Sequence, residues 1–235
     1  MSKFHRVVIK ISGEALAGEK KTGFDFDLIS SVCDALKKAS EAGVQIGIVI
    51  GGGNFWRGVK DGAGKVERVN ADRMGMLATC MNCIAVCDVL RQLGAKARVM
   101  TAVDIMGVGE RYDTRRAIEY LEAGEIVLFA GGSGAPFFST DTAAALRAAE
   151  IHADAILLAK NIDGVYSADP RKDASAVKFD SISYDEVLAR RLAVMDTTAT
   201  AIAMENEIPA AVFALADPEN ILRVLNGEAV GTLVK

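Results

Sequence analysis

The sequence is short of the residues on which several kinds of active site depend. It has two histidines and four cysteines in 235 residues. His5 precedes the first predicted strand and His152 follows a predicted helix, which are positions typical of surface or packing residues. The sequence also lacks the Gly-x-Ser-x-Gly pattern that carries the nucleophile of many acyl-transfer enzymes. We therefore expect no nucleophile activated by a histidine.

The cysteines are too few for a disulfide framework in a chain of this length, which favours a reducing compartment. Cys80, Cys83 and Cys87 fall at i, i+3 and i+7, so they share one face of a predicted helix. Metal-binding cysteines usually lie near a loop with a fourth ligand, whereas the neighbours here are apolar. The pattern favours packing in a core or an interface.

Neither a strong positive charge nor a long apolar run is present. The formal net charge is −4, which argues against a nucleic-acid partner. The pairs Lys20-Lys21 and Arg190-Arg191 are too short to change this. The stretch from Met74 to Cys87 contains Asn82 and is shorter than the roughly 18–20 residues that span a bilayer. Because Lys10 interrupts the first apolar run, no secretory signal is expected, and the sequence predicts a soluble cytoplasmic protein.

What the sequence has in plenty is alternation between β-rich and helical segments. Strands are expected at residues 6–11, 44–50, 97–101, 125–130, 155–159, 211–214 and 232–234. Helices are expected at residues 27–42, 72–93, 113–123, 140–151 and 196–207, with shorter ones opening at Ser183 and at Asp217-Pro218. This order predicts an α/β fold: a three-layer sandwich around a mostly parallel twisted sheet, formed by one domain over residues 1–235.

Several of these helices carry a polar residue that can cap their first turn. Asp27, Asp72 and Asp141 each stand near the start of a predicted helix, where a carboxylate can accept from orphan backbone N–H groups. Asp72 opens the most apolar of these helices. It can serve both as a cap and as an acceptor for sugar hydroxyls.

Three glycine-rich turns follow predicted strands, at Ser12-Gly13, at Gly51 to Gly53 and at Gly131 to Gly134. Ligands of parallel sheets bind at the carboxyl ends of the strands, where each of these turns lies. Glycine lets backbone N–H groups approach a phosphate without a Cβ in the way. The helix that opens after the third turn, at Ser139-Thr140-Asp141, adds an anion-binding N-terminus. The three turns together predict a phosphate site.

Two common phosphate-binding motifs nearly match and are disfavoured. Gly13 and Gly18 have the spacing of a P-loop, but Glu19 stands where that loop needs its lysine. Gly51 and Gly53 begin a dinucleotide-binding pattern, but Trp56 takes the place of the third glycine, which close helix–strand packing requires.

Cations beside the turns indicate what the site does. Lys10 ends the first strand, and Arg57 follows Gly53 by four residues. Positive charges at these places stabilise the negative charge that a transferring phosphoryl group spreads over its oxygens. Phosphoryl transfer needs little covalent help from the protein, which agrees with the absence of a catalytic triad.

Five segments in this order resemble those of the bacterial uridylate kinases, which belong to the amino-acid-kinase superfamily. They are KISGEAL at 10–16, GGGNFWRG at 51–58, DRMGMLA at 72–78, GAPFFSTD at 134–141 and DGVYSADP at 163–170. The similarity extends to Gly231-Thr232 and so covers nearly the whole chain. It implies transfer of the ATP γ-phosphoryl group to UMP, with Mg²⁺ carried by ATP, giving UDP for pyrimidine nucleotide synthesis.

The resemblance also implies roles for individual residues, with UMP bound mainly by the N-terminal part and ATP by the C-terminal part. Catalytic roles fall on Lys10, Arg57 and Asp141, of which Asp141 would also orient Mg²⁺. ATP contacts fall on Lys10, Ile11, Ser12, Gly13, Gly53, Arg57, Lys160, Asn161, Tyr166 and Asp169. UMP contacts fall on Gly52, Asp72, Ser133, Gly134, Ala135, Pro136, Phe137, Phe138, Ser139 and Thr140.

Two departures from the family leave questions open. Some relatives carry a threonine where this sequence has Lys160, so either Lys160 or Asn161 is the residue that contacts ATP. The loop from Gly18 to Gly23 is longer than in some relatives, at a place linked to GTP, which leaves GTP activation and UTP inhibition open. Family members are homohexamers built as trimers of dimers, and the apolar helix from Met74 to Leu90 is a suitable dimer surface.

Two other functions on the same fold stay open. One is a kinase for an acyl carboxylate or carbamate, against which Asp72 and the pair Phe137-Phe138 favour a nucleotide acceptor. The other is a nucleotide- or oxyanion-binding storage protein. A storage protein would not need Lys10, Arg57 and Asp141 together, because their charges serve phosphoryl transfer.

Overall fold

The computed structural model describes residues 2–57 and 64–235. Gly58, the last residue of the segment GGGNFWRG, therefore lies outside the described residues. The described strands form one sheet in the order β4-β3-β5-β2-β1-β6-β8-β9-β7. Their bounds are β1 Arg6–Ile11, β2 Gln45–Ile50, β3 Ala97–Thr101, β4 Glu110–Arg111, β5 Ile126–Ala130, β6 Ala155–Lys160, β7 Ser181–Ile182, β8 Ala210–Ala214 and β9 Thr232–Val234. Neighbouring strands are parallel except β8 and β9, which confirms the predicted sheet.

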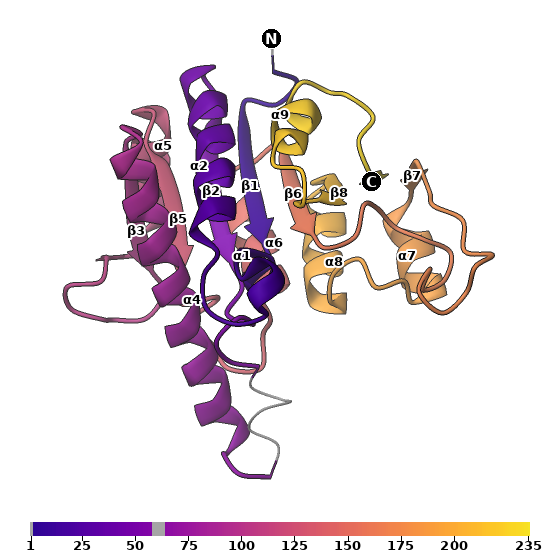
Figure 1. The fold of residues 1–235 in the computed structure, drawn as a ribbon, viewed down its shortest axis with the longest axis horizontal. Coiled ribbons are helices and arrows are strands. Elements are labelled where there is room, and N and C mark those ends of the chain that lie inside the picture. The colour runs from indigo at the N-terminus through magenta and orange to yellow at the C-terminus, as the bar shows by residue number, and fades with distance from the viewer. Residues whose placement is uncertain (1, 58–63) are drawn as a thin grey trace.

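Helices cover both faces of this sheet (Figure 1). Their bounds are α1 Gly13–Leu16, α2 Phe26–Glu41, α4 Arg68–Gln92, α5 Thr114–Glu122, α6 Thr140–Glu150, α7 Tyr184–Arg190, α8 Thr197–Glu205 and α9 Glu219–Leu225, with a 3₁₀ turn, η1, at Gly18–Lys20. Buried side chains of α1, α2, α4 and α9 pack on one face. Those of α5, α6, α7 and α8 pack on the other, which completes the three-layer sandwich.

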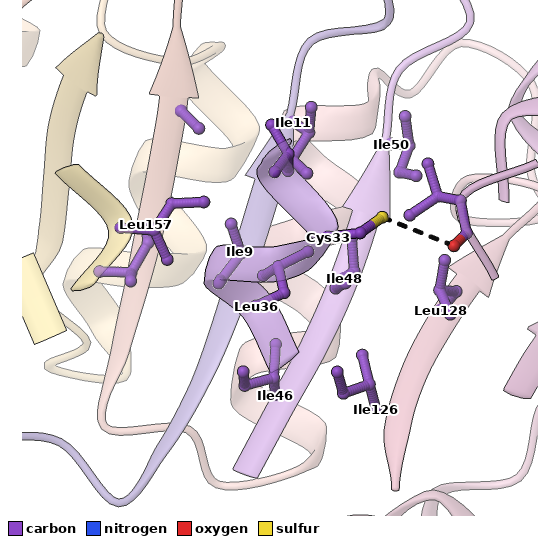
Figure 2. Close-up of a cluster of buried hydrophobic side chains, with 14 of the residues drawn as sticks. Ile9, Ile11, Cys33, Leu36, Ile46, Ile48, Ile50, Ile126, Leu128 and Leu157 are labelled. Atoms are coloured by element: carbon purple, nitrogen blue, oxygen red, sulfur yellow. Dashed lines mark hydrogen bonds between the residues drawn. The ribbon is translucent and has the colours of Figure 1, made fainter. Parts of the chain in front are cut away.

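Alternation along the strands separates two hydrophobic cores. In β1 the side chains of Val7, Ile9 and Ile11 enter the core beneath α2 and α4, whereas that of Val8 enters the core beneath α6. The central strands are buried on both faces, as expected for parallel strands covered by helices. Figure 2 shows the first core, in which Leu36 of α2 lies against Ile9 of β1 and isoleucines of β2.

The four cysteines belong to this first core, which agrees with the core or interface packing predicted for Cys80, Cys83 and Cys87. Cys33, Cys80, Cys83 and Cys87 are free thiols and are all buried. The Cys33 thiol donates weakly to the carbonyl of Val86, at 3.8 Å (Figure 2). Burial, aided by the neighbouring Cys87, raises the pKa of Cys33 to about 12. Within residues 2–57 and 64–235 no group of three or more His, Cys, Asp or Glu side chains could hold a metal ion.

Helix α4 is longer than the sequence predicted. It spans 25 residues and begins at Arg68 rather than Asp72, so its N-terminal part extends beyond the strand ends in Figure 1. By length and composition it could cross a membrane, but half of its most apolar stretch is buried inside the fold, as in the core helix of a globular protein. Its exposed side chains include Met74, Leu77, Met81 and Ile84.

Three of the predicted helix caps are wrong by one or more residues. The cap of α2 is Asp25, whose carboxylate accepts from the N–H of Leu28 at 3.2 Å, rather than Asp27. The cap of α6 is Ser139 rather than Asp141, and the Ser139 hydroxyl accepts from the backbone N–H groups of Asp141 and Thr142. Asp72 lies inside α4, one turn past its start. The N-cap position of α4 is Glu67, whose side chain makes no capping hydrogen bond.

Candidate active site

The three glycine turns lie together because β5, β2 and β1 are neighbours in the sheet. The first two turns touch through their backbones. A Cβ on Gly13 would lie 2.3 Å from the carbonyl oxygen of Gly51, so only glycine allows this approach. The hydroxyl of Thr140, at the start of α6, lies against the same Gly51. The predicted convergence of the turns at one edge of the sheet is thus present in the fold.

Helix α4 holds the second and third turns in place through polar side chains that the sequence analysis did not single out. The Asn82 amide donates to the carbonyl of Gly51 at 2.6 Å and to Asn54 Oδ1 at 2.8 Å. The hydroxyl of Thr79 accepts from the N–H of Gly131 at 2.9 Å. In the sequence, Asn82 is a polar residue within an apolar stretch. That position was the signal that could have identified Asn82 as a buried residue with a polar partner.

An ion cluster lies beside the turns, where Lys10 of β1, Asp141 of α6 and Lys160 of β6 meet. Lys10 Nζ lies 2.7 Å from Asp141 Oδ1, and Lys160 Nζ lies 3.8 Å from Asp141 Oδ2. Lys160 also donates to the carbonyl of Val194. Burial lowers the pKa of Lys160, and the nearby Lys10 charge adds to this, whereas Asp141 opposes it. The cluster places two ammonium groups on one carboxylate.

Asp196 is a further carboxylate of the site that the sequence analysis assigned only to a helix end. It caps α8 by accepting from the N–H of Ala199 at 3.0 Å, and it also accepts from the hydroxyls of Ser139 and Thr142. Burial works to raise the pKa of Asp196, but the hydrogen bonds from Ser139, Ala199 and Thr142 outweigh it and lower that pKa. Asp196 thereby ties α8 to the start of α6.

Arg57 reaches back toward the first turn. Its guanidinium lies 2.8 Å from the Glu14 carboxylate on α1, and its Nε donates to the carbonyl of Gly53 at 3.4 Å. Both side chains are about two-fifths exposed, at 41% and 43%. The predicted catalytic arginine is therefore beside the turns, with an acidic partner that the sequence analysis did not name.

A small pocket opens between α4 and the second and third turns. Its volume is about 120 Å³. Its lining includes the predicted residues Gly52, Asp72, Ser133, Phe138 and Thr140, together with Trp56, Ala71, Gly75, Met76, Thr79 and Gly132. Ala135, Pro136 and Phe137 do not line it, although Phe137 is tied to it because its N–H donates to Asp72 Oδ2 at 2.8 Å.

A second pocket of about 420 Å³ lies at the other end of the ion cluster. Lys160, Tyr166 and Asp169 line it, as do Arg190 and Arg191. The Tyr166 hydroxyl donates to Asp163 Oδ1 at 2.8 Å. Asn161, the alternative to Lys160, is exposed and is not part of this lining. The side chain of Ile11 is packed in the core, so only its backbone can reach a ligand.

Comparison with known proteins agrees with this geometry. Residues 5–214 match the model of the amino acid kinase family. The chain is 52% identical to a uridylate kinase of Limosilactobacillus reuteri over 234 residues, which covers 99% of this chain and 98% of the relative. This chain belongs to the uridylate kinases of the amino acid kinase family.

Solved structures of the family show the same fold. A UMP kinase from Bacillus anthracis superimposes with a TM-score of 0.95 at 37% identity, covering 99% of this chain and 96% of that one. A UMP kinase from Ureaplasma parvum gives 0.92 at 35% identity, with 98% of each chain covered. The family and the fold expected from the five sequence segments are therefore confirmed.

Proposed function

We propose that this protein transfers the γ-phosphoryl group of ATP to UMP and releases UDP and ADP. The observation that carries the proposal is the ion cluster of Lys10, Asp141 and Lys160 between two pockets. Asp141 follows Thr140, which lines the smaller pocket, and it pairs with Lys160, which lines the larger one. A phosphoryl group moving between the two ligands passes this cluster.

The residues divide between two ligands accordingly. ATP lies on the side of the larger pocket, with its phosphates over Ser12, Gly13 and Gly53 and its nucleoside near Tyr166 and Asp169. Lys160 is favoured over Asn161 as the ATP contact because it lines that pocket and Asn161 does not. UMP lies at the smaller pocket and extends beyond it, with Gly52, Asp72 and the loop from Ser133 to Thr140 around the nucleotide. Lys10 and Arg57 stabilise the negative charge of the transferring group.

Magnesium fits this arrangement as a partner of ATP. Within the described residues no cluster of three or more metal-ligating side chains occurs, and Asp141 is a carboxylate beside the transfer site. Mg²⁺ is commonly held by substrate phosphates and one or two carboxylates, so Asp141 and the ATP phosphates would hold it. Bound there, it would neutralise part of the phosphate charge.

The assembly we propose is a homohexamer of three dimers, with α4 at the dimer contact. Met74, Leu77, Met81 and Ile84 fall at i, i+3, i+7 and i+10 of α4 and are all exposed in the single chain. Exposed apolar stripes of this kind mark interaction sites. A cytoplasmic location stays a prediction from the composition of the sequence. GTP activation and UTP inhibition stay open, as possibilities drawn from the family resemblance.

A kinase for a carboxylate or carbamate is the second candidate. It requires an acceptor site without a place for a sugar. Asp72 is 15% exposed and lines the smaller pocket, which favours an acceptor with hydroxyl groups. The storage alternative is disfavoured because the Asp141 carboxylate holds two largely buried ammonium groups, those of Lys10 and Lys160, and such charges serve transfer rather than storage.

The test is ADP release coupled to a detection enzyme, measured with UMP, CMP, dUMP, acetylglutamate and carbamate as acceptors. Turnover with UMP should be the fastest. Lys10→Ala should lower kcat by roughly 10²–10³-fold while UMP binding is retained, because the charge it supplies acts in the transition state. Lys20→Ala, an exposed lysine on η1, is the matched control and should keep full activity. Turnover with acetylglutamate or carbamate but not with UMP would overturn the proposal. Absence of turnover with every one of these acceptors would overturn it as well.

A further inference from the structure

The carboxylate of Asp72 connects α4 to the loop between β5 and α6. Arg68 Nε donates to Asp72 Oδ2 at 2.8 Å, and the N–H of Phe137 donates to the same oxygen at 2.8 Å. The Arg68 guanidinium also lies over the Phe137 ring, 5.2 Å from its centroid. Arg68, Asp72 and Phe137 thus form a closed set of three contacts, which we term the clasp.

We propose that Arg68 is the positioning residue of the acceptor site: it fixes Oδ2 of Asp72, so that Oδ1 accepts from a hydroxyl of the acceptor's ribose. This inference rests on the proposed function, because it assumes a ribonucleotide in the pocket that Asp72 lines. Arg68 itself is not among the lining residues of that pocket, so it acts through Asp72 rather than on the ligand.

Helix stability does not account for an arginine at this place. Arg68 is the first residue of α4, where the positive end of the helix dipole opposes a cation. Its side chain is 45% exposed, and exposed ion pairs four residues apart contribute little to stability. Asp72, by contrast, is 15% exposed, so its orientation is fixed by the groups that donate to it. The position of the arginine is explained by what it does to that carboxylate.

The loop end of the clasp is held in an unfavourable conformation. Phe137 has φ of 72°, a left-handed conformation that bulky residues seldom adopt. Its side chain is 64% exposed, so burial of the ring does not pay for this backbone geometry. The bond from its N–H to Asp72 and the guanidinium over its ring are the contacts that stabilise it. Loss of Arg68 therefore loosens the carboxylate and the loop together.

The consequence is a role in recognising the sugar. A carboxylate held at one oxygen offers the other in a fixed direction, and a fixed acceptor discriminates between a ligand that has the hydroxyl and one that lacks it. With Arg68 removed, Asp72 rotates and this discrimination weakens. The hydroxyl in question is the 2′-hydroxyl of the ribose. UMP has it and dUMP lacks it, so these two nucleotides are the probes.

Three substitutions of Arg68 distinguish positioning of the Asp72 carboxylate from simple attraction of the nucleotide phosphate by a positive charge. Arg68→Met removes the donor and the charge. Arg68→Gln keeps an amide donor that can reach Asp72 four residues on, without charge. Arg68→Lys keeps the charge but loses the planar fork that donates to a carboxylate and lies over a ring. Arg73→Met is the matched control, because Arg73 is exposed on the same helix and its side chain donates to Asn70 rather than to Asp72.

We expect Arg68→Met to raise the KM for UMP about tenfold with kcat within about twofold of wild type, as for loss of a charge-assisted hydrogen bond in binding. The ratio of kcat/KM for UMP over dUMP should fall, and Arg68→Gln should restore more of that ratio than Arg68→Lys. The control variant should behave as wild type.

The inference is overturned if Arg68→Met leaves the UMP/dUMP ratio unchanged, or if Arg68→Lys restores it and Arg68→Gln does not, because attraction of the phosphate would then suffice. A loss of kcat alone, with KM and the ratio unchanged, overturns it as well. Wild type is assayed first with UMP. Absence of UMP turnover there contradicts the proposed function itself, and thus is distinguished from a failure of this inference.

Discussion

Asn54 and Asn82 exchange two hydrogen bonds in the interior of the protein. The Asn54 amide donates to Asn82 Oδ1 at 3.0 Å, and the Asn82 amide donates to Asn54 Oδ1 at 2.8 Å. Both side chains are almost completely buried, at 1% and 0% exposure. The pair joins the second glycine turn to α4, and Asn82 further donates to the carbonyl of Gly51. A polar pair in this place sets the position of a turn that glycine alone leaves adaptable.

Asn82→Leu keeps the side-chain size and removes every one of these bonds. It removes the Asn82 donor from Asn54 Oδ1 and from the Gly51 carbonyl, while the Asn54 amide keeps its bond to the carbonyl of Gly23. We therefore expect a loss of about 2–4 kcal/mol in the free energy of unfolding. Urea denaturation measures it. Asn206→Ala, at the exposed end of α8, is the control and should change stability by less than about 1 kcal/mol. Equal effects of the two substitutions would show that the buried pair has no special role.

Asp196 makes the stability dependent on pH. Because its pKa is lowered in the folded state, its stabilising effect is complete above the ordinary Asp value of 3.8 and is lost as the pH falls through the lower folded value. Asp196→Asn should cost about 1 kcal/mol at pH 7, since the amide is a weaker partner for Ser139 and Thr142. Denaturation of both proteins at several pH values should show this difference shrinking in acid. A difference in the free energy of unfolding that stays the same at low pH would contradict this prediction.

We expect Glu14 to compete with the proposed ATP phosphates for Arg57. The two side chains lie 2.8 Å apart, beside the turn where phosphates are proposed to bind. Exposed pairs of this kind contribute at most about 1 kcal/mol, so Glu14→Gln should lower the KM for ATP by only about two- to fivefold and leave kcat unchanged. Steady-state kinetics with varied ATP measures this. Glu19→Gln, exposed on η1, serves as the control. A higher KM for ATP would show that Glu14 supports binding.

The exposed stripe of α4 predicts the assembly. Leu77→Glu and Met81→Glu place a charge on side chains that are 51% and 47% exposed in the single chain. A charge buried without a partner is costly, so both variants should sediment as smaller species than wild type. Val177→Glu changes a residue that is 65% exposed away from α4, and it should leave sedimentation unchanged. Wild-type protein that sediments as a monomer at micromolar concentration would remove the basis for this prediction.

Much of the fold could be predicted because its signals are local. Strands β1, β3 and β9 have the predicted bounds, since their apolar runs end at a polar or charged residue: Ser12, Thr101 and Lys235. The two-residue strands β4 and β7 were not predicted, because two residues carry no periodicity and owe their conformation to the neighbouring strand. The start of α4 was misplaced for a similar reason: Arg68 to Ala71 have no apolar pattern of their own.

The site divides in the same way. The sequence by itself determined the glycine turns, the lysine next to the last residue of β1 and the family, because these depend on residue types at fixed spacing along the chain. Only the tertiary structure decided which groups meet: Glu14 with Arg57, Asp196 with Ser139, and Arg68 with Asp72 and Phe137. Asp196 lies 57 residues from Ser139, and Phe137 lies 65 from Asp72. Contacts at such separations depend on how strands order in the sheet, and no local pattern encodes that order.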